Sequence, residues 1–346
     1  MSPTGSIGPE PTLRAVSLTN YAAVARFAGL DPRAMLLRAG LNPDPGDDPD
    51  IRIPARPVVK LFADSAKASG MAGFGLLMAE CRTLSTLGPA SLLLRHQPTV
   101  RAMMETAIRA QRHFSDVVNL SLNDDGETAI LRWDFLPEFA EPQWVEYSVA
   151  IGLHSFSEVT RGRWHPENVH FTHLRPDDVM WHKRVFQCGL EFDADCIGLS
   201  FPSAMLDMPN VLANPPLAAH AERLLGMVPV SRLEGSATER ARHATFLLVH
   251  SGAATVERVA ETLGMHPRAL QRQLGREGRT FAQLLNETRR ELAQRYLLGA
   301  HHSLAAISRL AGYSSQSAFT RWFVAEFGLS PMAWREQAAR RVAVRA

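Results

Sequence analysis

Apolar residues recur every three to four positions through much of the chain, and this spacing predicts a largely helical protein. The helical spacing begins near residue 20 and is strong in two segments, ARPVVKLFADSAKA (55–68) and PTVRAMMETAIRAQRHF (98–114). The second of these segments places five apolar residues on one face: Val100, Met103, Met104, Ala107 and Ile108. Residues 1–18 lack this spacing, are rich in Pro, Gly, Ser and Thr, and are predicted to be disordered.

The hydrophobic pattern changes to strict alternation in NLSLNDDGETAILRWDF (119–135). Asp125 and Gly126 interrupt the alternation and predict the turn of a β-hairpin. Two further strands are predicted in ENVHFTHL and CIGLSFP. Residues 19–225 are therefore predicted to form an α+β domain, in which helices pack on a small, mainly antiparallel sheet.

A polar segment, GMVPVSRLEGSATER (226–240), is broken by Pro229 and Gly235 and predicts a linker. Residues 241–337 return to helical spacing and predict an all-α domain, with glycines at the breaks between helices. The chain is therefore predicted to hold two domains of ordinary size, which its 346 residues allow.

A helix-turn-helix pattern occupies residues 255–278. The first helix carries an apolar stripe formed by Val256, Val259, Ala260 and Leu263. Gly264 can adopt the left-handed conformation that a tight turn requires, and Pro267 suits the first turn of the next helix. Leu270 and Leu274 share the inner face of that second helix. Its outer face is predicted to present three residues: Arg268, Gln271 and Arg272.

The same pattern recurs in SLAAISRLAGYSSQSAFTRWFVAEFG (303–328). Gly312 marks the turn, and the second helix buries Phe319, Phe323 and Phe327, which lie one helical turn apart. Trp322 is predicted to pack beside these rings. The outer face is predicted to present four residues: Gln316, Ser317, Thr320 and Arg321. A connecting helix of about 17 residues, near 25 Å long, could place the two second helices about one DNA turn (~34 Å) apart.

Arginine and glutamine at these positions have the chemistry of base recognition, because arginine pairs with guanine and glutamine with adenine in the major groove. The alternative is that they form solvated helix faces. The charge distribution favours DNA: residues 236–346 hold 16 arginines and 8 acids, net +8, whereas residues 1–235 hold 21 basic and 27 acidic residues, net −6.

Residues 240–337 resemble the DNA-binding domain of AraC/XylS-type transcription regulators. The resemblance is carried by VAETLGMHPRALQRQL, RRELAQRYL, ISRLAGYSSQSAFTRWFVAEFG and LSPMAWR. It implies base contacts from Arg268, Gln271 and Arg272 in the first unit and from Gln316, Ser317 and Arg321 in the second. The sequence departs from the family at His266, where a small capping residue such as serine is usual.

Residues 13–225 resemble the non-cupin, arabinose-binding-like regulatory domain found in a subset of these proteins, through YAAVARFAGLDPRAMLLRAGL, IPARPVVKLF, RWHPENVHFTHLRP and FQCGLEFDADCIGLSFP. The resemblance implies a homodimeric regulator, more often an activator, that binds double-stranded DNA, works with RNA polymerase and senses a small-molecule effector. The alternative is an interaction and dimerisation module without a ligand. Four tryptophans could line an effector pocket or form plain core: Trp133, Trp144, Trp164 and Trp181.

The sequence offers no sign of an enzyme, since G-x-S-x-G, a Gly-rich phosphate loop and H-E-x-x-H are all absent. Five histidines between residues 154 and 182 lack the spacing of metal ligands, so neither a metal nor another cofactor is predicted. Three cysteines, an odd count, are predicted to be reduced thiols. Neither a membrane span nor a secretory signal is evident, which predicts a cytoplasmic protein.

Overall fold

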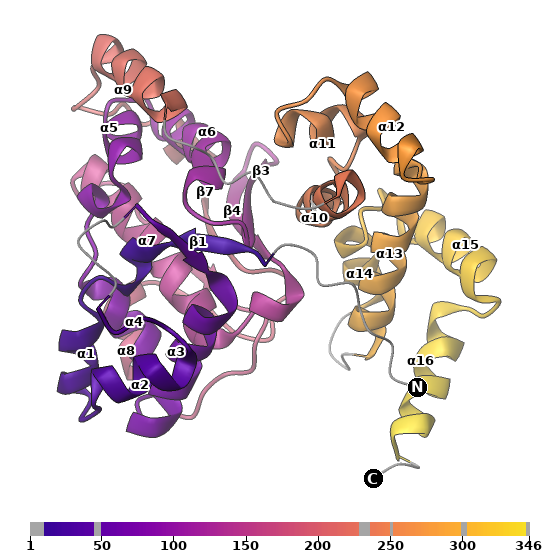
Figure 1. Cartoon of the computed structure of the whole chain (residues 1–346), viewed down its shortest axis with the longest axis horizontal. Helices are drawn as coiled ribbons and strands as arrows, with labels where there is room; N and C mark the ends of the chain where they lie inside the picture. Colours follow the sequence, from indigo (N-terminus) through magenta and orange to yellow (C-terminus); the bar gives the residue numbers. More distant parts are fainter. Residues whose placement is uncertain (1–9, 45–49, 228–235, 250–251, 299–302, 344–346) are drawn as a thin grey trace. The chain divides into compact units, whose positions relative to one another are not determined.

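The computed structural model describes residues 10–44, 50–227, 236–249, 252–298 and 303–343 and shows two compact units (Figure 1). One unit lies within Glu10–Arg232 and combines helices with strands. The other lies within Leu233–Ala346 and is helical. An α+β unit followed by an all-α unit is the fold class that the sequence predicts.

The first unit contains a five-stranded sheet with the strand order β3-β4-β7-β5-β6. Its strands are β3 (Val118–Asp124), β4 (Thr128–Phe135), β5 (Asn168–His170), β6 (Gly189–Glu191) and β7 (Gly198–Pro202). Neighbouring strands are antiparallel except β5 and β6, which are parallel. The predicted mainly antiparallel sheet is therefore confirmed.

The β3–β4 hairpin forms where the alternating pattern predicts it, with Asp124 opposite Ala129. Gly126 has φ +93°, a conformation that L side chains rarely adopt. The Asp125 carboxylate accepts hydrogen bonds from the main-chain N–H groups of Glu127 and Thr128, at 3.0 and 2.8 Å. These bonds lower the pKa of Asp125 and hold the turn in place.

The helices of the first unit are α1 (Tyr21–Phe27), α2 (Pro32–Ala39), α3 (Ala55–Ser69), α4 (Phe74–Glu80), α5 (Pro89–Arg95), α6 (Val100–Ala110), α7 (Pro142–Thr160), α8 (Met180–Phe186) and α9 (Pro215–Met227). Helix α7 packs against α3, α4 and α8 (Figure 1). Phe62 of α3 meets Trp144 and Tyr147 of α7, with ring centroids 5.4 and 5.0 Å apart. This aromatic cluster anchors α7 in the core.

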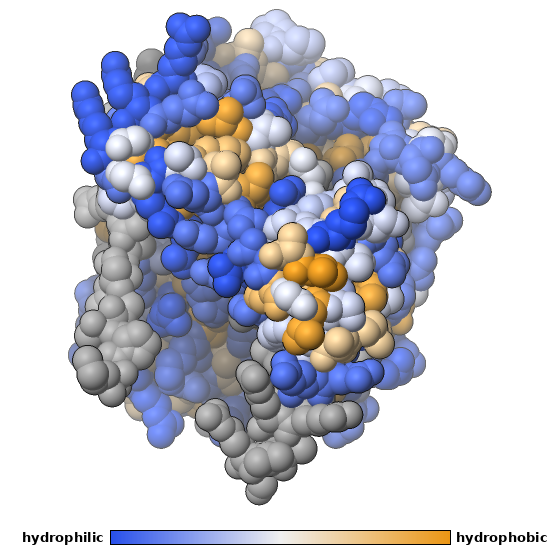
Figure 2. Space-filling model, turned by 90° about the vertical axis from the view of Figure 1, so that its right-hand side faces the viewer, coloured by the Kyte–Doolittle hydropathy of each residue, from blue (hydrophilic) through white to orange (hydrophobic). Residues whose placement is uncertain are grey.

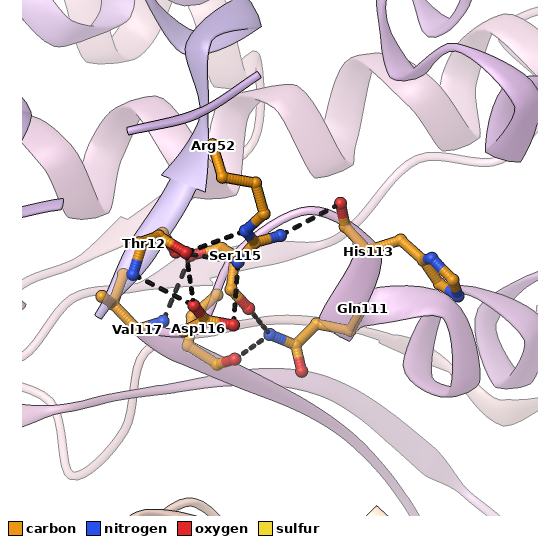
Figure 3. A network of polar contacts seen from close by, with 8 residues as sticks. Thr12, Arg52, Gln111, His113, Ser115, Asp116 and Val117 are labelled. Atoms are coloured by element: carbon orange, nitrogen blue, oxygen red, sulfur yellow. Dashed lines mark hydrogen bonds and ion pairs between the residues drawn. The ribbon is translucent and has the colours of Figure 1, made fainter. Parts of the chain in front are cut away.

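A polar network ties the short strands β1 (Thr12–Arg14) and β2 (Arg52–Pro54) to the start of β3 (Figure 3). The Asp116 carboxylate accepts hydrogen bonds from the main-chain N and the Oγ1 of Thr12, at 3.0 and 2.7 Å. Arg52 Nη2 lies 2.8 Å from Asp116 Oδ1, and Arg52 Nε donates to Thr12 Oγ1 at 2.8 Å. The network joins three segments that lie far apart in the sequence.

The prediction of disorder for residues 1–18 is wrong for residues 10–18. Thr12–Arg14 pairs with β2, and Ala15–Leu18 forms one turn of 3-10 helix. Leu13 is fully buried, so this segment contributes to the core. A three-residue strand is too short to show a hydrophobic period, which explains the error. Residues 1–9 lie outside the described residues.

The second unit consists of α10 (Ala237–Val249), α11 (Val256–Thr262), α12 (Pro267–Arg276), α13 (Phe281–Leu298), α14 (Leu304–Leu310), α15 (Gln316–Phe327) and α16 (Pro331–Ala343). The predicted linker, 226–240, is too long at both ends, because α9 continues to Met227 and α10 begins at Ala237. Its middle, 228–235, lies outside the described residues. The Glu277 carboxylate accepts from the N–H groups of Ala237 and Thr238 at 2.8 and 2.9 Å, which satisfies the start of α10.

Helix α13 takes part in both hydrophobic cores of the second unit. Near its start, Leu284 packs with buried residues of α10, α11 and α12. Near its end, Ala293 and Leu297 pack with buried residues of α14 and α15. Its 18 residues span about 27 Å at ~1.5 Å per residue. A single helix therefore joins the two helix-turn-helix cores.

Candidate nucleic-acid interface

The first helix-turn-helix is formed by α11 and α12, and the turn between them has the predicted geometry. Gly264 has φ +64°, and the N–H of Met265 donates to the Ala260 carbonyl at 2.8 Å, which closes α11. Pro267 occupies the first turn of α12. His266 Nδ1 accepts from the N–H of Arg268 at 3.3 Å. His266 therefore caps α12 although the family usually has a small residue here.

The second helix-turn-helix is formed by α14 and α15. Ser315 Oγ accepts from the N–H of Ala318 at 3.2 Å, which caps α15. Gly312 has φ +74°, and a Cβ on it would lie 2.5 Å from the Val249 carbonyl oxygen. The turn therefore requires glycine both for its conformation and for space. Arg289 of α13 donates to the Gly312 carbonyl at 3.1 Å and stacks 4.4 Å from the Tyr313 ring centroid.

The anchoring residues of both second helices are buried as predicted, except Phe327, which is half-buried. Leu270 and Leu274 of α12 and Phe319 and Phe323 of α15 are all 0% exposed. Trp322 packs against the rings of Tyr313, Phe319, Phe323 and Phe327. Its indole Nε1 also donates to Asn286 Oδ1 of α13 at 2.6 Å. Trp322 is therefore a packing residue, as predicted.

Seven residues, named here the reading residues, lie on the other side of these helices: Arg268, Gln271 and Arg272 on α12, and Gln316, Ser317, Thr320 and Arg321 on α15. All are exposed except the half-buried Thr320. When Leu270 is aligned with Phe319, Arg272 occupies the same place on α12 as Arg321 on α15. Within the described residues, the three arginines of this set, Arg268, Arg272 and Arg321, make no ion pair.

Figure 2 shows the side on which Figure 1 places α15, and this side carries many hydrophilic residues together with distinct hydrophobic patches. Arg268, Arg272 and Arg321 bring three positive charges to the two helices. Exposed, rigidly held donors on a positively charged unit are suited to bind the edges of bases and the phosphates of a nucleic acid.

The first unit contains a cavity of about 150 Å³ beside the core. Its apolar wall comes from α6, β3, β4 and α7 and includes Met103, Leu120, Trp133 and Phe156. Trp144 also lines it, so two of the four tryptophans considered from the sequence are at the cavity. Trp164 is instead fully buried between Phe156 and Phe201. The remaining one, Trp181, stacks with the Arg184 guanidinium at 5.2 Å.

Most cavity residues could not be found from the sequence, because they come from segments between residues 13 and 156 that meet only in the fold. In the sequence, only the tryptophans pointed to such a cavity, and Trp133 and Trp144 do line it. Gly152 of α7 shapes the wall: a Cβ there would lie 2.4 Å from Trp133 Cζ2, so glycine makes room for the indole.

Three of the five histidines considered from the sequence make polar contacts. His182 Nε2 and His173 Nε2 lie 2.8 and 3.3 Å from Glu146 Oε1. His170 lies between Glu191 and Ser200, at 2.6 and 2.8 Å. Among the residues that the structure describes, no group of His, Cys, Asp and Glu is arranged to hold a metal ion.

None of the described helices is both long enough and apolar enough to cross a membrane.

The chain is similar to known transcription regulators along most of its length. Residues 29–210 match the family described as the arabinose-binding domain of AraC transcription regulators, N-terminal, and residues 259–337 match a helix-turn-helix domain family. The HTH-type transcriptional regulator VirS of Mycobacterium tuberculosis is 26% identical over 329 residues, which cover 93% of this chain and 96% of VirS.

Two similar proteins come from Pseudomonas aeruginosa. The ornithine utilization regulator is 26% identical over 315 residues, which cover 89% of this chain and 91% of that protein. A solved structure of the transcriptional regulator CdpR is 18% identical, covers 88% of this chain and 96% of that chain, and has a TM-score of 0.41.

Proposed function

The chain belongs to the AraC family of DNA-binding transcription regulators and is not an enzyme. We propose that it reads a specific operator with both helix-turn-helix units. Helices α12 and α15 would enter successive segments of the major groove on one face of the duplex. The observation that carries this proposal is the pairing of buried anchors with exposed reading residues on both helices.

The anchors position the helices, and the reading residues make the contacts. Helix α12 is held in its core by Leu270 and Leu274, and α15 by Phe319 and Phe323. Because the helices are already held in place, little of their rotational freedom is lost when DNA binds. Arg272 and Arg321 can each pair with guanine O6 and N7, and the glutamines can pair with adenine. The His266 cap holds the first turn of α12, which supports contacts from that helix as well as from α15.

Changing Arg321 to alanine should weaken binding to the operator by about 1–3 kcal/mol, because a bidentate contact with one base is lost. The operator would first be selected from random duplex DNA with the full-length protein. Affinities for the selected site, for its single-base variants and for random DNA would then be measured at one salt concentration. Specificity should relax at one base position.

Two further variants make this test sharper. Arg272→Ala should relax a different base position, and the two losses should add when both changes are combined. Arg26→Ala removes the same charge from an exposed site on α1 and should leave operator affinity unchanged. Equal losses of affinity for operator and random DNA would instead make Arg321 a phosphate contact.

We further propose that the first unit binds a small-molecule effector in the cavity and that the protein is a homodimeric, cytoplasmic activator that works with RNA polymerase. A cavity of about 150 Å³ with apolar walls and few polar groups has the character of a small-molecule site. It favours an effector over the alternative, in which the first unit is an interaction and dimerisation module without a ligand.

Effector control requires that the two units communicate, and the part of the predicted linker that lies between α9 and α10 is the proposed joint. An effector that favours one arrangement of the units should change operator affinity by about 1–3 kcal/mol. Inserting ten Gly/Ser residues within 228–235 should abolish this change, while operator affinity without effector stays the same. Titrations of operator DNA with and without effector would measure it, and an unchanged response in the insertion variant would exclude the linker as the joint.

A further inference from the structure

The cavity of the first unit has an unbalanced charge. Two arginines line it, Arg14 and Arg82, and none of the lining residues is acidic. Arg14 is paired, because its guanidinium contacts the Asp50 carboxylate and donates to the Leu87 carbonyl at 2.9 Å. Arg82 lies just after α4 and is 5% exposed. Its guanidinium donates to the main-chain carbonyl of Val16, which is a neutral acceptor.

Two buried donors at the cavity lack an acceptor among the described residues. One is the Nε–H of Arg82, and the other is the indole N–H of Trp144. The Tyr147 hydroxyl, also at the cavity, already donates to the Ser17 carbonyl at 3.3 Å. No carboxylate in the described part of the chain forms an ion pair with Arg82. The cavity therefore offers unused hydrogen-bond donors and a positive charge, and it lacks a matching anion.

A buried cation without a counter-ion is costly, and such groups are normally paired. A bound anion would remove this cost, since its oxygens would accept from the free donors and neutralise the guanidinium. The rest of the wall is apolar, so the remainder of the ligand must be apolar too. An apolar cavity of about 150 Å³ can hold a molecule the size of benzene.

We propose that this cavity binds a compact amphipathic monocarboxylate, with an aromatic ring or a chain of about six to eight carbon atoms against the apolar wall and its carboxylate on Arg82. The inference rests on the proposed effector role of the first unit and names the chemical class of that effector. Arg82 is the residue that selects the anion, and Trp133 and Phe156 contact the apolar part.

The test uses the full-length chain and matched series of acids and neutral or cationic analogues: benzoate, hexanoate and octanoate against benzamide, hexanamide and hexylamine. Tryptophan fluorescence, to which Trp133 and Trp144 contribute, reports titration and melting. At 100 times its dissociation constant, a binding acid should raise the melting temperature of the first unit by about 5–10 °C. The amides and the amine should bind at least tenfold more weakly.

Variants separate charge recognition from general damage. Arg82→Met should reduce the affinity for acids by about 10–100-fold and change that for amides by less than about threefold. Its melting temperature without ligand should equal or exceed that of the unmodified protein, because the uncompensated charge is gone. Arg82→Lys should keep part of the preference for acids. Arg26→Met, at an exposed position on α1, should change nothing.

The proposal is wrong if amides bind as well as acids, if Arg82→Met weakens acids and amides equally, or if no acid of the series binds. Operator affinity with and without the bound acid is measured separately. An acid that binds through Arg82 and leaves operator affinity unchanged would contradict effector control, while the ligand class would stand.

Discussion

Replacing Phe323 by alanine should destabilise the second unit by about 3–5 kcal/mol and abolish specific DNA binding. Phe323 is 0% exposed and stacks on Phe327 with ring centroids 4.3 Å apart. It also contacts the rings of Phe319 and Trp334, at 5.6 and 6.2 Å. Alanine would leave a cavity between α13, α15 and α16 that the surrounding helices cannot fill. The loss is a large fraction of the unfolding free energy of a small domain.

Thermal and urea unfolding of the full-length chain, followed by circular dichroism and by operator binding, would measure this effect. The first unit should melt as before, because Phe323 belongs to the core of the second. Val324→Ala is the matched control: its side chain is 43% exposed, and the change should stay within about 0.5 kcal/mol. Operator affinity that survives Phe323→Ala would show that α15 does not depend on its aromatic anchor.

Replacing Asp116 by alanine should destabilise the first unit by about 3–5 kcal/mol, because it breaks a largely buried ion pair and removes the carboxylate that Arg52 and Thr12 share. The Asp116 side chain is 7% exposed and that of Arg52 is 18% exposed. Both the N–H and the hydroxyl of Thr12 would lose the carboxylate as well. The junction of β1, β2 and β3 should open, while the second unit should be unaffected.

Asp116→Asn is a milder variant, since its amide oxygen can still accept from Thr12 but carries no charge for Arg52. It should cost less than Asp116→Ala in the same urea titration. Asp44→Ala removes an exposed ion pair with Arg33, whose side chains are 78% and 65% exposed, and should cost less than about 1 kcal/mol. Similar unfolding midpoints for the variants at Asp116 and Asp44 would contradict a structural role for the network.

The helix-turn-helix units could be predicted in detail because their signals are local. Gly264 and Gly312 adopt the left-handed conformation that the turns require, and the apolar period identifies the residues that are buried. The hairpin at Gly126 was predictable for the same reason. In each case the sequence pattern and the structural element extend over the same few residues, so the pattern can be read without the rest of the fold.

The missed features depend on contacts between distant segments. Strands β1 and β6 have three residues each and are held by partners elsewhere in the chain. Arg82 is charged and lies between two short helical segments, which favours a surface position, yet the fold buries it at the cavity. These positions require the tertiary structure. His266 is a different case: it caps α12 through a local contact of its ring nitrogen, a role that residue preferences at helix starts do not predict.

Helix α13 joins the two cores of the second unit, and its length therefore sets both the distance and the rotation between the two helix-turn-helix motifs. Inserting one residue near its middle would turn everything beyond by about 100° and shift it by about 1.5 Å. Seven residues would restore the facing direction to within about 20° and add about 10.5 Å, but over that distance the duplex itself turns by about 105°. The period of the α-helix and the period of the DNA duplex have no short common multiple. A protein that reads one duplex with both helix-turn-helix motifs can therefore change the spacing of the two DNA segments that it reads only by remodelling elements outside α13.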